Sequence, residues 1–121
     1  MSTSRKNQII YNSKQFSDRK KLAYVHALKS DFLEKDIAHE SMTQTQLKNL
    51  ADNLEVPLSR LFDTKNAIEC GISEPHNLDE LSKLKVMQKI PQTIQTPILI
   101  KDDKYLLVDD IGDIIRLEQG N

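Results

Sequence analysis

The sequence predicts an α/β fold built on a small mixed four-stranded sheet. Two observations lead to this prediction. An apolar strand, an amphipathic helix and a second strand follow one another within residues 8–37, and near the other end a proline precedes two short apolar runs and a closing helix. Patterns between them are mainly helical. We therefore expect one domain, 1–121, with a frayed tail at 1–6 and a helical insertion at 38–90.

The N-terminal part is expected to form a strand, a helix and a parallel strand. Residues 8–11 contain two isoleucines, which is typical of a strand covered on both faces. Ser17 or Asp18 can cap the helix, which keeps a helical spacing of apolar residues to about Ser30. The second strand is expected within 31–37, and a connection of this kind is right-handed.

Helix signals dominate the middle of the chain. Thr43 and Gln46 are spaced as a capping box, which starts a helix with a leucine stripe. Pro57 suits the first position of a short helix. The pattern fades from 63 to 75, where we expect a loop, and residues 77–80 then cap a helix that ends before Pro91.

The C-terminal part predicts a hairpin and a last helix. The apolar runs at 96–100 and 105–108 are separated by Lys-Asp-Asp-Lys, and aspartate tolerates the left-handed backbone of a tight turn. The final helix is expected over 109–117, with acidic residues at its start as the helix dipole favours.

Composition excludes several classes of protein. With 121 residues, 38% of them hydrophobic and 29% charged, the chain can fold alone. No stretch is apolar enough for a signal peptide or a membrane span, so we expect a cytoplasmic protein with no membrane partner. Residues 1–35 hold 8 Lys or Arg against 3 Asp or Glu, which we attribute to a solvated helix face; nucleic acid is not expected as a partner.

The predicted order of elements is a thioredoxin-like plan, and three stretches are more specific. Residues 9–22 run from Ile-Ile-Tyr-Asn to Asp-Arg-Lys-Lys-Leu. This stretch resembles the opening of the glutaredoxin-dependent arsenate reductase (ArsC) family and its Spx-type regulator relatives, which pass from an apolar strand through Asn-Pro-x-Cys to Ser-Arg. Residues 54–62 and 90–100 resemble later landmarks of that family. The resemblance covers nearly the whole chain and implies a thioredoxin-like fold.

The departures from the family pattern concern its chemistry. Gln15 stands where the family has its cysteine, and Ser13 stands in place of the proline. The other family arginines fall near Asp63, Thr96 and Val108. Glutamine cannot form a thiolate, and an oxyanion site needs several converging donors. The resemblance therefore implies a catalytically degenerate member, a non-enzymatic binding or regulatory module for an unidentified protein partner.

The resemblance also implies a candidate binding cleft, made by Asn12, Gln15, Arg19, Thr96 and Pro97. In thioredoxin-like folds the proline is usually cis, and the residue before it offers its backbone N–H and C=O to an extended peptide or to glutathione. X-Pro bonds are the kind that adopt the cis form, and exposed backbone can pair with a ligand strand. In the alternative interpretation, Pro97 only starts an edge strand. No resident cofactor is expected.

The alternative function is a glutathione- or glutaredoxin-coupled thiol oxidoreductase of the same family. Its thiol would be Cys70, or that of a glutathione held by Thr96 and Arg19. Cys70 follows Glu69, and a neighbouring carboxylate disfavours a thiolate. The histidines show no metal-ligand spacing, and the paired aspartates at 102–103 and 109–110 suit turns and caps, so no metal site is expected.

Overall fold

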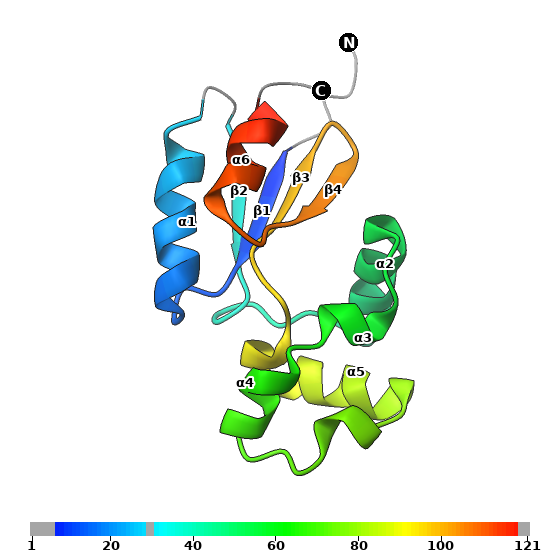
Figure 1. The fold of residues 1–121 in the computed structure, drawn as a ribbon. Coiled ribbons are helices and arrows are strands. Elements are labelled where there is room, and N and C mark those ends of the chain that lie inside the picture. Colours follow the sequence, from blue (N-terminus) through cyan, green and yellow to red (C-terminus); the bar gives the residue numbers. More distant parts are fainter. Residues whose placement is uncertain (1–6, 29–30, 119–121) are drawn as a thin grey trace. The chain divides into compact units, whose positions relative to one another are not determined.

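The computed structural model describes residues 7–28 and 31–118, and they divide into two compact units. The first unit contains residues up to Asp36 and from Thr96 onward, and the second contains Ile37–Gln95. Figure 1 shows the elements of both units in chain order. The sheet lies wholly in the first unit, so the second unit is inserted between two of its strands.

The first unit is built on a four-stranded mixed sheet with the order β2-β1-β3-β4. β1 (Gln8–Tyr11) pairs in parallel with β2 (Leu33–Asp36) and antiparallel with β3 (Ile98–Lys101). β3 also pairs antiparallel with β4 (Lys104–Leu107). The predicted sheet, its parallel N-terminal pair and its C-terminal hairpin are thus confirmed.

Two helices pack against the sheet through a shared apolar core. They are α1 (Phe16–His26) and α6 (Ile111–Glu118). The core joins residues of β1, β3, both helices and the segment after β4, namely Ile9, Tyr11, Val25, Leu99, Val108 and Ile114. Ile9 and Ile10 are both buried although adjacent strand residues point to opposite faces, as predicted for a strand covered on both sides.

The second unit is helical. It contains α2 (Gln44–Leu54), α3 (Leu58–Leu61), α4 (Thr64–Glu69), α5 (Glu80–Lys89) and two short 3₁₀ turns at Pro75–Asn77 and Pro91–Thr93. The capping box of Thr43 and Gln46 is present as predicted. Backbone hydrogen bonds from Asp63 N to Thr93 O, at 2.6 Å, and from Gln95 N to Leu61 O, at 2.7 Å, fasten the returning chain to the end of α3.

Several predicted boundaries differ from the structure. Residues 63–75 are not only a loop, because α4 begins in this stretch with Asp63 as its cap. α1 ends at His26, short of Ser30, and β2 is limited to four residues. Pro57 is the cap before α3 and not its first residue. The hairpin turn is as expected: Asp102 and Asp103 have φ values of 51° and 67°.

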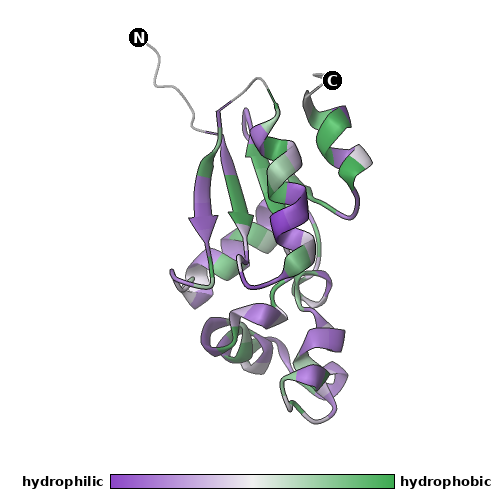
Figure 2. Cartoon of the chain, turned by 90° about the vertical axis from the view of Figure 1, so that its left-hand side faces the viewer, coloured by the Kyte–Doolittle hydropathy of each residue, from purple (hydrophilic) through white to green (hydrophobic). Residues whose placement is uncertain are grey.

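The hydropathy of α1 varies along its length (Figure 2). In Figure 2, where α1 faces the viewer, hydrophilic and hydrophobic segments alternate along this helix.

Within residues 7–28 and 31–118, no helix has the length and apolar character that crossing a bilayer requires.

Candidate functional site

The loop between β1 and α1 is closed by its own backbone and by Asn12. Gln15 N donates to Asn12 O at 3.0 Å, and Lys14 N donates to the Asn12 side-chain oxygen, also at 3.0 Å. Ser13 N donates to Asp36 at the end of β2, at 3.0 Å. The loop therefore delivers Gln15 to the N-cap of α1 in an extended conformation. Asn12 is a buried structural residue of this turn.

Thr96 and Pro97 lie where the chain enters β3. The peptide bond between them is cis, as the resemblance implied. β3 is paired on both sides, by β1 and by β4, so the alternative that Pro97 starts an edge strand is wrong. Pro97 O accepts a hydrogen bond from Val108 N at 3.0 Å. Within the described residues, the backbone N–H and C=O of Thr96 have no hydrogen-bond partner.

Asp18 joins these two segments. Its Oδ2 accepts from Asn12 N at 2.8 Å and from the Thr96 hydroxyl at 2.5 Å. Its Oδ1 is buried and has no hydrogen-bond partner among the described residues. The prediction that Ser17 or Asp18 caps α1 is therefore wrong. Gln15 is the N-cap, no side chain among the described residues caps the helix, and Asp18 binds Asn12 and Thr96 instead.

Burial sets the electrostatics of Asp18. The side chain is 1% exposed, and loss of solvation raises its pKa above its ordinary value of 3.8. The hydrogen bonds from Thr96 and Asn12 and the charge of Lys21 act in the opposite direction, while Asp36 adds to the increase in pKa. The ionised carboxylate is thus held in place at a cost to the folded state, which is common at functional sites.

Arg19 lies on the outer side of the same loop. Its Nη1 donates to Ser13 O at 2.9 Å, and its guanidinium lies 5.7 Å from the centre of the Phe16 ring. This geometry fixes the exposed side chain over the start of α1, and the guanidinium has N–H donors besides the one that binds Ser13. Arg19 is thus a positionally fixed cation at the start of α1.

Residues 12–18, which form the loop and the first turn of α1, contain no cysteine. Gln15, at the helix start, has an amide side chain, which neither attacks a substrate nor changes its charge. Cys70 is the C-cap of α4, in the second unit. A helix C-terminus has a partial negative charge, the opposite of that at a helix N-terminus.

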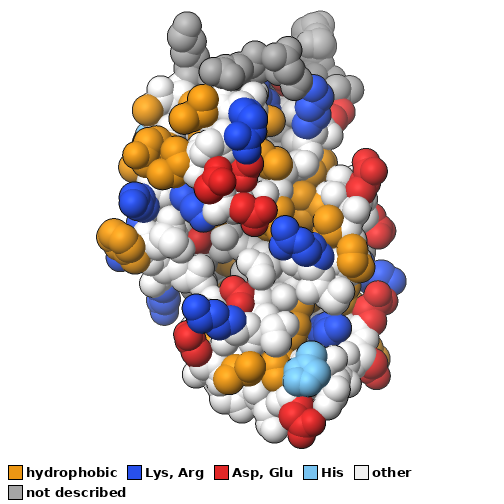
Figure 3. Space-filling view, in the orientation of Figure 1, with side chains coloured by type: hydrophobic (Ala, Val, Ile, Leu, Met, Phe, Trp, Pro, Cys, Tyr) orange, Lys and Arg blue, Asp and Glu red, His pale blue; other side chains and the backbone are white. Residues whose placement is uncertain are grey.

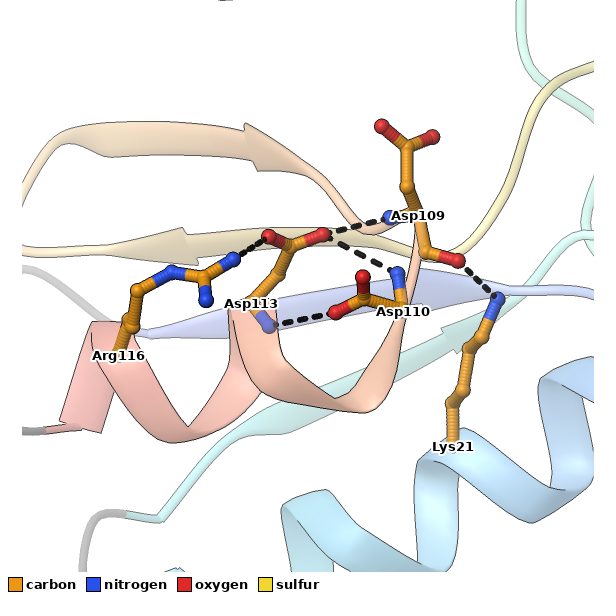
Figure 4. A network of polar contacts seen from close by, with 5 residues as sticks. All are labelled: Lys21, Asp109, Asp110, Asp113 and Arg116. Atoms are coloured by element: carbon orange, nitrogen blue, oxygen red, sulfur yellow. Dashed lines mark hydrogen bonds and ion pairs between the residues drawn. The ribbon is translucent and has the colours of Figure 1, made fainter.

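The other groups singled out in the sequence have structural explanations. His26 and Glu34 are in contact at 2.6 Å on the surface of the first unit. Asp110 caps α6 by accepting from Asp113 N at 3.2 Å, and Asp113 in turn accepts from Asp109 N and Asp110 N at 2.9 and 3.1 Å (Figure 4). Lys21 donates to the Asp109 carbonyl at 3.3 Å. Among residues 7–28 and 31–118, no three His, Cys, Asp or Glu side chains gather as a metal site would require.

Comparison with known proteins identifies the fold. No family model matches the sequence, and neither does any curated protein. Solved structures do match over nearly the whole chain. An arsenate reductase from Vibrio cholerae superposes with a TM-score of 0.72 at 16% identity, covering 94% of this chain and 98% of the other. The fold is that of the arsenate reductases.

Two further structures with this arsenate reductase fold agree. A protein from Yersinia pestis, provisionally described as an arsenate reductase, gives a TM-score of 0.76 at 18% identity, with 91% and 98% of the two chains covered. An arsenate reductase (ArsC) related protein from Brucella melitensis gives 0.71 at 17%, with 96% and 97% covered. These likenesses confirm the predicted thioredoxin-like fold.

The predicted site residues are distributed over one loop and one strand entry. Asn12 and Thr96 are joined through Asp18, while Gln15 and Arg19 occupy the start of α1. Sequence reasoning missed the bridge made by Asp18. Its only sequence signal was an acidic residue in the first turn of a helix, where its charge favours the helix start in any case.

Proposed function

We propose that the protein is a non-enzymatic binding module related to the arsenate reductases and Spx-type regulators, acting in the cytoplasm. The observation that supports this most is the backbone of Thr96, whose N–H and C=O have no partner in the described part of the chain and lie at the entry to a central strand. An extended peptide or the peptide-like backbone of glutathione can pair with these two groups. The absence of a cysteine from residues 12–18 favours binding over thiol chemistry.

The ligand site comprises the five residues of the predicted cleft. Thr96 provides the two backbone hydrogen bonds, and Pro97 follows it at the start of the chain's entry into β3. Arg19 provides a cation for a ligand carboxylate, and the Gln15 amide provides a donor and an acceptor at the helix start. Asn12 holds the loop that presents them.

A titration of the isotope-labelled protein tests this site. The probes are reduced glutathione and a blocked peptide of alternating alanine and valine, with an N-methylated copy of the peptide as the matched control. We expect the amide signals of Thr96, Ile98 and the 12–19 loop to shift with the first two probes and to stay unchanged with the control. Binding of the N-methylated peptide, or no shifts with either probe at millimolar concentration, overturns the proposal.

A turnover assay tests the non-enzymatic part separately. With arsenate, glutathione and glutaredoxin supplied, we expect the rate to equal that of a protein-free control, because no described residue at the start of α1 can act as the attacking thiol. Turnover above this background would show an enzyme. Its loss in Cys70→Ser would assign the activity to Cys70, and its persistence in that variant would assign it to bound glutathione.

A further inference from the structure

α1 has apolar residues on two opposite sides. Val25 and the half-buried Leu22 face the core of the first unit. Phe16 and Tyr24 are instead exposed, by 71% and 43%. Surface helices normally place polar residues on the side away from the core, so two exposed aromatic side chains on this side are unusual.

The outward side of α1 forms a continuous stripe. At about 100° per residue, Phe16, Lys20, Ala23 and Ala27 fall within a narrow sector opposite Val25, because they are spaced at i, i+4, i+7 and i+11. Arg19 and Tyr24 lie on its two flanks. The alanines are small, which allows another helix to approach the backbone closely. All six side chains are exposed.

The charge of this stripe is of one sign. Between residues 7 and 28 the acidic residue is Asp18, and its side chain is buried on the inner side of the helix. Arg19 and Lys20 therefore have no acidic neighbour on the outward side of α1 itself. In Figure 3, Lys or Arg and hydrophobic side chains lie next to one another along the left edge, where Figure 1 places α1.

Part of the stripe is ordered before any partner arrives. The guanidinium of Arg19 is held by Ser13 O at 2.9 Å and lies over the Phe16 ring. A fixed side chain loses less conformational entropy on binding, and arginine with aromatic residues is the usual composition of an interface centre.

We propose that the outward stripe of α1, made by Phe16, Arg19, Lys20, Ala23, Tyr24 and Ala27, docks an acidic amphipathic helix of a partner protein. Apolar side chains of that helix pack on Phe16 and the two alanines, and its carboxylates pair with Arg19 and Lys20. A single nucleic-acid strand fits less well, because the two alanines in the stripe offer its phosphates no donor. Arg19 belongs to both this stripe and the candidate cleft, whereas the Thr96 backbone belongs to the cleft alone.

The test uses a blocked peptide of roughly 15 residues, a length at which an isolated helix begins to be stable. It contains leucines at i, i+4, i+7 and i+11 and glutamates on the flanks. Control peptides replace the glutamates by glutamine or the leucines by serine. We expect saturable binding of the acidic peptide by calorimetry, with amide shifts confined to α1, and at least tenfold weaker binding of both controls.

Variants of exposed residues complete the test. Phe16→Ala and Lys20→Glu should each lower the affinity for the acidic peptide several-fold. Lys20→Glu should also raise the affinity for a version of this peptide that has lysine in place of glutamate. Lys85→Glu, at an exposed position of α5, is the matched control and should change neither. Thermal melts check that all variants fold. The proposal is overturned if the wild-type chain binds the lysine-containing peptide as tightly as the acidic peptide, or if it binds a single-stranded oligonucleotide more tightly than the acidic peptide. Shifts of the Thr96 amide with glutathione report only on the other site.

Discussion

Replacing Thr96 by valine removes one hydroxyl group while keeping the shape of the side chain. In the native protein this hydroxyl donates to Asp18 Oδ2 at 2.5 Å, beside the bond from Asn12 N. The variant leaves the carboxylate with a single donor among the described residues, and its other oxygen is already unpartnered. We therefore expect Thr96→Val to lower the free energy of unfolding at neutral pH.

The size of the effect follows from the charge of the acceptor. A hydrogen bond to an ionised group contributes about 1.5–3 kcal/mol, and one between neutral groups contributes about 0.5–1.5 kcal/mol. Thr96→Val should cost about 2 kcal/mol in the native background and about 1 kcal/mol when Asp18 is replaced by asparagine. The double-mutant cycle should thus give a coupling of about 1 kcal/mol, well above the usual error of additivity of about 0.3–0.5 kcal/mol.

The pH dependence provides a second measurement on the same variants. Because the pKa of Asp18 is raised in the folded protein, the folded state binds this proton more tightly than the unfolded state. The ionised side chain therefore costs stability above its folded pKa, and this cost vanishes below the unfolded value, near 3.8. Asp18→Asn should gain stability relative to the native chain as the pH rises from acid to neutral.

Urea unfolding followed by circular dichroism measures both quantities. A loss of 2 kcal/mol corresponds to a shift of about 1 M in the urea midpoint for a protein with a slope of about 2 kcal/mol/M. Thr93→Val is the matched control, since its hydroxyl also makes a hydrogen bond, to Ile90 O at 2.7 Å, but lies in the other unit. Equal costs of Thr96→Val in both backgrounds, or coupling of Thr93 to Asp18, would refute the reasoning.

Three further predictions concern helix ends. Thr43→Ala removes the acceptor of Gln46 N and should cost about 1 kcal/mol, seen as a lower melting temperature; an unchanged melting curve contradicts the role of the capping box. Glu55→Gly relieves a φ of 59° and should stabilise the protein by up to about 1 kcal/mol; destabilisation in urea would count against it. The pKa of Asp79 is lowered, mainly because its side chain accepts a hydrogen bond from Ser82 N. Asp79→Ala should therefore destabilise the protein at neutral pH, and the loss should shrink as the pH falls toward the lowered pKa. A difference in unfolding free energy that stays constant between pH 7 and pH 2 would contradict this role.

Local signals in the sequence account for most of the fold. The capping box at Thr43, the two aspartates of the hairpin turn and the isoleucines of β1 each specify their structure within a few residues. These signals are independent of the rest of the chain, so a single sequence suffices to interpret them. Together, these local signals predicted the thioredoxin-like order of strands and helices.

What the sequence did not reveal depends on short elements or distant partners. α4 has six residues with only Ala67 buried, so no apolar period marks it, and its Asp63 cap was the available signal. Asp18 is an acidic residue in the first turn of a helix, which is a common position for such residues. Its side chain nevertheless binds Thr96, which is 78 positions away. No helix-start rule can predict a partner at that separation, and for this reason the centre of the candidate site appeared only in the structure.

The position of β3 between β1 and β4 has a consequence for synthesis. β1, α1 and β2 leave the ribosome long before Ile98–Lys101, because residues 37–95 are translated in between. During that interval one backbone edge of the nascent strand Gln8–Tyr11 lacks its β3 partner. Because this strand also contains two isoleucines, its open edge can pair with a strand of another chain. Chains interrupted before residue 98 should therefore aggregate, and a chaperone should bind them at this strand.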